Sequence, residues 1–154
     1  MQPLLINDLT LPKLLQLANT LNPSGHLVVT PSKLVCLDID DAYIHQLFPL
    51  LKIANAVKPN YFNEGGIGAH ISVIYPEEQV VLDSQDIGTE HSFKVTGIFS
   101  TVIEQKKYYA LKVQATTLLD IRKHYRLSKQ LNFKNYGIDL HITIAVAIRL
   151  HCEE

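Results

Sequence analysis

The sequence predicts an α+β domain with two similar halves packed around a central cleft. Short runs in which apolar and polar residues alternate are typical of half-buried strands, and they lie between segments with helical spacing of apolar residues. Residues 27–75 and 93–148 also share one order of elements: two strands, a helix, a loop and a strand that carries a histidine. We interpret this order as an internal structural duplication. It predicts a single domain over residues 1–154, with pseudo-twofold-related lobes of antiparallel strands at about 26–80 and 92–150 and helices outside.

The first half begins with helical spacing of leucines over residues 9–21, and an Asn-Pro-Ser-Gly turn signal ends this segment. Residues 27–30 and 34–37 predict two strands around a tight connection. The aspartate pair that follows can cap a helix reaching to about residue 54. Pro49 removes a backbone hydrogen bond inside that helix, so we expect a kink or two short helices there.

Residues 58–68 are rich in Gly, Asn and Pro, a composition that predicts a loop leading into the first histidine strand. The loop is either a flap or phosphate-binding backbone beside His70, or an ordinary turn. The run Gly65-Gly66-Ile67-Gly68 matches no nucleotide-binding fingerprint, which favours the ordinary turn.

The second half opens with a long strand over residues 93–101. Alternation predicts that one face of this strand carries Phe93, Val95, Gly97, Phe99 and Thr101. Gln105-Lys106-Lys107 is expected to turn the chain back as a hairpin. Thr117 as a cap, with Asp120 three residues on, predicts a helix to about residue 130. Asn135-Tyr136-Gly137 then forms the link into the second histidine strand.

Two predicted strands carry the same polar pattern. His70-Ile71-Ser72 and His141-Ile142-Thr143 each present an imidazole and a hydroxyl on one face, because alternate residues of a strand share a face. The central isoleucine of each motif points the other way and can anchor the strand in the core. Either histidine alone would more often be a half-buried strand residue, but a matched pair in duplicated halves favours a functional site.

These two motifs resemble the signature of the two-histidine (2H) phosphoesterase superfamily, which includes the RNA 2′,3′-cyclic phosphodiesterases and the 2′-5′ RNA ligases. That signature is a pair of His-x-Ser/Thr motifs on strands, one in each half of the chain, although Thr is commoner than Ser in the first motif. The resemblance implies a bilobed 2H phosphoesterase-like fold with a central cleft. It also implies that a 2′,3′-cyclic phosphate or a 2′-5′ linkage sits between His70 and His141, and that no metal or other cofactor is needed.

Hydrolysis of a phosphodiester requires a group that accepts a proton, a group that donates one, and hydrogen-bond donors for the nonbridging oxygens. Two imidazoles with an ordinary pKa near ~6.5 can divide the first two roles at neutral pH. Ser72 and Thr143 can supply the donors. We therefore expect His70 and His141 to be catalytic in a metal-independent phosphodiesterase for a small nucleotide or oligonucleotide, including cyclic oligonucleotides. Which histidine is the acid and which the base depends on the orientation of the substrate.

Two alternatives stand beside this hypothesis. The first is a noncatalytic nucleotide- or RNA-binding module on the same fold. The second is a metal-dependent hydrolase, which is less favoured because no Cys or carboxylate lies at short ligand spacing from either histidine and no His-Glu-x-x-His helix is present.

One locally basic stretch precedes the second histidine strand. It comprises Arg122, Lys123, Arg126, Lys129 and Lys134, interleaved with Tyr125 and Tyr136. It is either a contact surface for phosphates and bases or the solvated face of an amphipathic helix, and the second interpretation is slightly favoured. Within it, Lys134 and Tyr136 lie in the loop that leads to His141, so we predict that these two bind substrate. Tyr75, by contrast, is predicted to be a core residue because alternation puts it on the face opposite His70 and Ser72.

Composition limits the classes of partner. The 154 residues are 47% hydrophobic and 19% charged, enough apolar surface for one core without disulfides. The formal net charge of −1 argues against long nucleic acid held by its phosphates, so we expect a nucleotide or short RNA as the partner and no long double-stranded nucleic acid. Cys36 and Cys152 form no disulfide framework, and neither a secretory signal nor a membrane-spanning stretch is visible. We therefore expect a cytoplasmic monomer with reduced thiols and no membrane partner.

Overall fold

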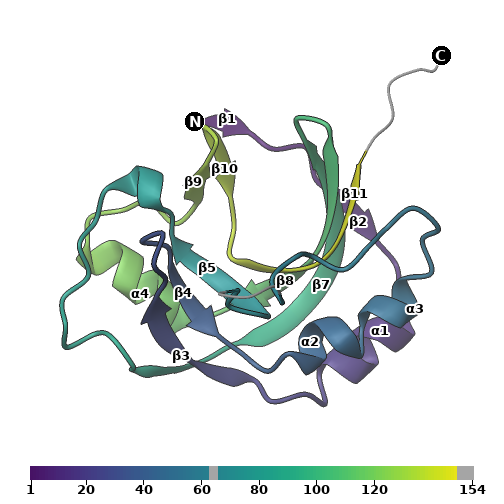
Figure 1. Ribbon diagram of the computed structural model, residues 1–154, viewed down its shortest axis with the longest axis horizontal. Coiled ribbons are helices and arrows are strands. Elements are labelled where there is room, and N and C mark those ends of the chain that lie inside the picture. The colour runs from purple at the N-terminus through teal and green to yellow at the C-terminus, as the bar shows by residue number, and fades with distance from the viewer. Residues whose placement is uncertain (63–65, 149–154) are drawn as a thin grey trace.

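Two four-stranded antiparallel sheets make up most of the structure (Figure 1). The computed structural model describes residues 1–62 and 66–148. The first sheet has the order β5-β4-β3-β6, with β3 (Ser24–Val29), β4 (Val35–Asp38), β5 (His70–Ile74) and β6 (Glu90–Ser92). The second has the order β11-β8-β7-β2, with β2 (Asn7–Leu9), β7 (Lys94–Ile103), β8 (Lys106–Gln114) and β11 (His141–Ile148). The architecture is therefore α+β and dominated by its sheets.

The two histidine strands meet where the sheets meet. β5 and β11 are each the edge strand of their own sheet, and the two strands contact one another. A bridge between Val57 and Val146 adds the loop before β5 to the outer edge of β11. The fold thus brings the two motifs side by side, although they lie far apart in the chain.

A third, smaller sheet contains β1 (Gln2–Pro3), β10 (Tyr136–Ile138) and β9 (Leu131–Phe133) in that order. The predicted link at 135–137 is therefore wrong, because this segment belongs mainly to β10. Lys134 and Asn135 join β9 to β10 with φ angles of 51° and 68°, as in the two-residue turns whose twist suits a hairpin. Neither residue is glycine, which is why the hairpin is hard to see in the sequence.

The helices are short. They are α1 (Pro12–Ala18), α2 (Ala42–His45), α3 (Phe48–Leu51) and α4 (Thr116–His124), with a 3₁₀ turn η1 (Pro76–Glu78). Pro49 lies in the first turn of α3, where a helix has no use for the missing N–H, so the prediction of two short helices is confirmed. In Figure 1, α4 lies beside the first sheet, whereas α1, α2 and α3 gather at the other side of the molecule. None of the helices in the described residues has the length and apolar character that crossing a membrane requires.

The prediction for α4 is wrong at both ends. Ala115 occupies the cap position without a side-chain hydrogen bond, and the Thr117 hydroxyl instead pairs with His91 Nδ1 at 2.8 Å. The helix stops at His124 because Arg126 takes a positive φ of 63°, which a right-handed helix does not allow.

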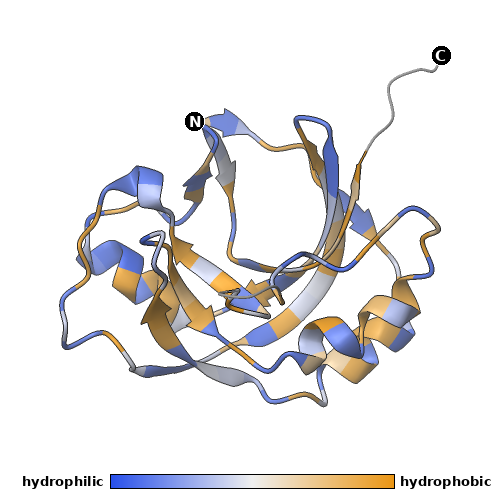
Figure 2. Cartoon of the chain, viewed as in Figure 1, coloured by the Kyte–Doolittle hydropathy of each residue, from blue (hydrophilic) through white to orange (hydrophobic). Residues whose placement is uncertain are grey.

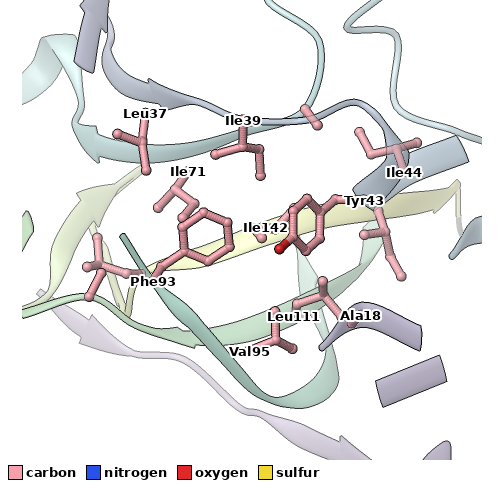
Figure 3. Close-up of a cluster of buried hydrophobic side chains, with 14 of the residues drawn as sticks. Ala18, Leu37, Ile39, Tyr43, Ile44, Ile71, Phe93, Val95, Leu111 and Ile142 are labelled. Carbon is pink, nitrogen blue, oxygen red and sulfur yellow. The ribbon is translucent and has the colours of Figure 1, made fainter. Parts of the chain in front are cut away.

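One cluster of buried side chains extends through both large sheets and includes residues of α1, α2 and α3. Figure 2 shows hydrophobic residues recurring along the strands that enclose it. Tyr43 and Phe93 pack against each other in this cluster with tilted rings whose centroids lie 5.4 Å apart, and Figure 3 shows Ile71 and Ile142 in the same cluster. Both isoleucines are fully buried, so each histidine strand is anchored in the core as the alternation predicts.

A bulge in β7 changes which of its alternating side chains face the core. The register with β8 shifts between Val95 and Gly97, so Thr96 has no partner of its own. Before the bulge Phe93 and Val95 belong to the core, whereas after it Phe99 and Thr101 line a cavity. The prediction of one continuous face over residues 93–101 is therefore wrong.

Candidate active site

The two histidines line one cavity of about 490 Å³. His70 is the first residue of β5 and His141 the first of β11, and each is 8% exposed. Ser72 and Thr143 line the same cavity and are equally buried, at 6% and 9% exposed. The structure therefore brings both motifs, with their imidazoles and hydroxyls, to a single hollow.

Each imidazole is held in the same way. His70 Nδ1 lies 2.8 Å from the carbonyl oxygen of Gly68, and His141 Nδ1 lies 2.8 Å from that of Asp139. A carbonyl oxygen only accepts hydrogen bonds, so the proton must sit on Nδ1 in both rings. Nε2 is then the nitrogen left to gain or lose a proton toward the cavity, and this orientation suits general acid and base chemistry.

Gly68 shapes the support of His70. It has a positive φ of 78°, and a Cβ at this position would collide with Asp41 Oδ1, which accepts a hydrogen bond from the Ala69 N–H at 3.0 Å. Only glycine adopts this backbone without cost while leaving space for the carboxylate. The glycine-containing loop thus serves to direct a carbonyl at the imidazole.

Burial lowers the pKa of both imidazoles from the ordinary value, because the charged form loses solvation. At His70 the hydrogen bond to Gly68 and the charge of Asp38 oppose this effect. At His141 the hydrogen bond to Asp139 opposes it, whereas the charge of His70 lowers the pKa further.

Both histidine strands contain a bulge directly after the hydroxyl residue. Val73 is the extra residue of β5 against β4, and Ile144 is the extra residue of β11 against β8. Each bulge reverses the alternation, so that Tyr75 and Val146, three residues after each hydroxyl, line the cavity. The prediction that Tyr75 is a core residue pointing away from Ser72 is therefore wrong, because both residues line the same cavity.

Aromatic rings form much of the cavity wall. They belong to Tyr61, Tyr75, Phe99, Tyr108 and Phe133. The Tyr61 ring packs edge-on against His70 with centroids 4.6 Å apart, and Thr143 of the other motif lines the same cavity. Burial raises the pKa of Tyr61, Tyr75 and Tyr108, so these hydroxyls stay protonated and can donate hydrogen bonds.

Several of these residues escape prediction from the sequence. Residues 57–61 line the cavity, so the loop before His70 contributes a wall of the site as well as turning the chain. Lys106, at the start of β8, also lines it and supplies a cation. The only sequence signal for this group is proximity: 57–61 precede the first motif, and Lys106 and Tyr108 begin the strand that pairs with the second.

Lys134 and Tyr136, the other predicted substrate-binding residues, do not line the cavity. The Lys134 ammonium lies 2.6 Å from the Glu104 carboxylate and 5.4 Å from the centre of the Phe133 ring. Tyr136 pairs with Phe133 and Gln2 in the small sheet. The hairpin of β9 and β10 takes the place of the expected loop, with Lys134 in its turn and Tyr136 in β10. Their role in substrate binding stays a prediction.

Arg122 fits neither interpretation of the basic stretch. It is 1% exposed and forms a bidentate pair with Glu78, with Nη–Oε distances of 3.0 and 2.8 Å. Its other hydrogen bonds go to the carbonyl oxygens of Ser128, Val73 and Gln130. All five N–H groups of the guanidinium are thus engaged within the protein, and Arg122 is a structural residue.

A second cavity, of about 850 Å³, shares Phe99 and Ile138 with the first and contains no histidine. Lys112 at its wall forms an ion pair with Asp8 at 2.6 Å. Across residues 1–62 and 66–148, no three His, Cys, Asp or Glu side chains gather in a way that could hold a metal ion.

Comparison with known proteins identifies the family. The model of the 2H-SAK family, described as "Swiss Army Knife, 2H phosphoesterase domain", matches residues 35–151, which is most of the chain and includes both motifs. No curated protein and no solved structure gives a match. The match supports a phosphodiesterase-type function in general terms. The chain therefore belongs to the 2H phosphoesterases, as a member of the Swiss Army Knife family.

Proposed function

We propose that this protein is a metal-independent phosphodiesterase that acts on a small nucleotide or oligonucleotide by two-histidine general acid and base catalysis. The substrate carries a 2′,3′-cyclic phosphate, a 2′-5′ linkage or a cyclic oligonucleotide backbone. The observation that carries this proposal is the matched support of His70 and His141, whose Nδ1 atoms both donate to carbonyl oxygens beside one cavity.

In this mechanism the neutral imidazole takes a proton from water at Nε2 while the water oxygen attacks phosphorus. The bond from phosphorus to the leaving 2′, 3′ or 5′ oxygen breaks, and the protonated imidazole gives its Nε2 proton to that oxygen. The hydroxyls of Ser72 and Thr143 donate to the nonbridging oxygens. Tyr61 and Tyr75 line the same cavity as these hydroxyls, and their phenol groups stay protonated because burial raises their pKa.

The size and lining of the cavity favour a small ligand. Its volume of about 490 Å³ and its aromatic walls suit a nucleobase, and Lys106 offers a charge for a phosphate. The pseudo-twofold relation of the two halves forms part of the proposal. It is supported by the antiparallel order of both sheets, by the position of each histidine strand at a sheet edge, and by the matching bulges.

The activity is tested by incubating the protein, in excess chelator, with 2′,3′-cyclic nucleotides, 2′-5′ and 3′-5′ dinucleotides and cyclic dinucleotides, and resolving the products by chromatography. We expect hydrolysis of at least one of the proposed classes at a rate that the chelator does not change. Activity that chelation abolishes and a divalent cation restores would favour a metal-dependent hydrolase. Binding without turnover across the whole panel would favour a noncatalytic binding module.

Replacement of either histidine separates catalysis from binding. His70→Ala and His141→Ala should each lower turnover about 10²- to 10⁴-fold, because a positioned acid or base contributes about that much. Ligand affinity, measured by calorimetry, should change far less. His124→Ala is the matched control, since His124 is exposed on α4 and lies outside the cavity lining. Wild-type turnover in either site variant would refute the proposed mechanism.

A further inference from the structure

The two imidazoles have the same hydrogen-bonded support but opposite charges as their strand neighbours. In the first sheet, Asp38 of β4 lies directly opposite His70 of β5. In the second sheet, Lys112 of β8 occupies the corresponding position opposite His141 of β11. Residues directly opposite each other in an antiparallel pair project from the same face, with Cβ atoms about 5 Å apart. A carboxylate therefore accompanies one imidazole and an ammonium the other.

We propose that Asp38 is a positioning residue for the proton: its carboxylate makes His70 the protonated general acid and leaves His141 as the neutral general base. This inference rests on the proposed function for its catalytic roles. The charge asymmetry itself rests on the strand registers alone.

The other groups around His70 do not cancel the effect of Asp38. The Tyr61 ring faces His70 but is uncharged, and the Asp41 carboxylate lies near Gly68, where it accepts a hydrogen bond from the Ala69 N–H. His26 of β3 lies opposite Asp38 and partly neutralises it when protonated. Lys58 of the loop at 57–61 lines the cavity, with its ammonium 3.1 Å from His45 Nδ1. Charges of both signs are thus present, but the carboxylate is the one in direct register with His70.

The surroundings of His141 work in the opposite sense. A proton on His70 repels a second proton on His141, and burial disfavours charge there without a carboxylate in register to offset it. The Asp139 carboxylate is nearby and favours the charged form, but it also accepts a hydrogen bond from Gln130 at 3.3 Å. Lys112 turns its ammonium toward Asp8, which leaves its stem beside Gly97. A single proton shared between the two imidazoles is therefore favoured at His70.

The decisive experiment is a pH titration of the histidine ring resonances by NMR in the protein without ligand. The signals are assigned by their loss in His70→Gln and His141→Gln. We expect His70 to titrate at higher pH than His141. The side chain of Asp38 is exposed. Asp38→Asn should move the His70 titration to lower pH and reduce the difference between the titration midpoints of His70 and His141. Asp8→Asn, which releases Lys112 on the other sheet, is the matched control and should leave His70 unchanged.

The pH dependence of kcat/KM provides a second test, because a purely structural role of Asp38 would leave it unchanged. A general acid must be protonated, so loss of Asp38 should shift the alkaline limb of the kcat/KM profile to lower pH. The rate at neutral pH should fall less than about tenfold, because the carboxylate is solvent-screened. Asp38→Glu should restore most of the activity that Asp38→Asn loses at neutral pH. About 1 M salt should make the pH profiles of wild type and Asp38→Asn alike, because salt screens the carboxylate.

The outcomes separate this inference from the proposed function. A His141 titration at or above that of His70, or an unchanged His70 titration in Asp38→Asn, overturns the role of Asp38 even if the protein hydrolyses its substrate. The expected titration order without turnover on any substrate sustains the charge asymmetry but overturns the assignment of acid and base.

Discussion

His70 and His141 show how a few neighbouring atoms set the tautomer and the pKa of an imidazole. The carbonyl oxygens of Gly68 and Asp139 fix the tautomer of each ring, and burial lowers the pKa of both imidazoles. The proposed mechanism requires at least one ring to be charged, whereas burial disfavours an imidazolium at either position. A bound phosphate would relieve this conflict, because its negative charge stabilises the imidazolium.

The same burial predicts how stability depends on pH. Because the folded pKa of both histidines is lowered, the unfolded chain binds more protons near pH ~6.5, and the free energy of unfolding should increase with pH through that range. It should level off below the folded pKa values, where both states are protonated. Urea unfolding between about pH 5 and about pH 8 measures this slope.

The matched variant for this measurement is the double substitution His70→Gln/His141→Gln, which removes both titrating groups. Its slope should be smaller than that of the wild type. Some slope should persist, because burial also lowers the pKa of His91. A double variant with the full wild-type slope would show that the two site histidines do not gain their neutral form on folding.

At the scale of single elements, strand alternation in the sequence predicts the site only as far as the next bulge. It places His70 with Ser72 and His141 with Thr143 on the cavity side, and the isoleucines between them in the core. It then fails at Tyr75. The reason is physical: the bulged Val73 presents its carbonyl to Arg122, which is 49 residues away in the chain. Local periodicity contains no information about such a partner.

The hairpin of β9 and β10 also depends on partners that are distant in the chain. Its turn residues, Lys134 and Asn135, both have positive φ without being glycine. A chain adopts this costly backbone when pairing with neighbouring strands stabilises it, here with β1 from the opposite end of the chain. The expected loop is a hairpin because of a strand pairing that local signals do not reveal, and neither Lys134 nor Tyr136 lines the cavity.

The contacts of Arg122 between elements can be tested by mutation. It joins α4 to the bulge of β5 and, through Glu78, to the Tyr75 backbone N–H, which donates to Glu78 Oε1 at 3.0 Å. Arg122→Met should lower the free energy of unfolding by about 3–5 kcal/mol, because it leaves the buried Glu78 carboxylate without its partner. Urea unfolding at neutral pH provides the measurement.

Two further variants identify the cause. Arg122→Met/Glu78→Gln removes the unpaired charge and should recover part of the lost stability. Lys123→Met makes the same substitution on the exposed face of α4 and should change stability by less than about 0.5 kcal/mol. If Arg122→Met changed stability as little as Lys123→Met, the buried hydrogen bonds of Arg122 would not stabilise the fold.

At the scale of the whole molecule, the site is a junction between two sheets that share one core. Ile71 and Ile142 lie in the same buried cluster beneath the two histidine strands, so apolar packing fixes the relative position of the imidazoles (Figure 3). Strands β5 and β11 contact each other although they belong to different sheets. The geometry of the pair therefore depends on the core as much as on the residues that line the cavity.

This arrangement predicts that the two large sheets unfold together. Ile142→Ala in β11 should lower the free energy of unfolding by about 2–5 kcal/mol, since it removes a fully buried side chain. Amide hydrogen exchange should then lose protection to the same extent in β3 and β4 as in β7 and β8, because global opening exposes both sheets at once. Ile148→Ala makes the same change in the same strand at a position that is 68% exposed, and it should leave both sheets protected. Wild-type protection of β3 and β4 in Ile142→Ala would mean that the halves unfold independently. In that case the spacing of the imidazoles would depend on contacts weaker than a shared core.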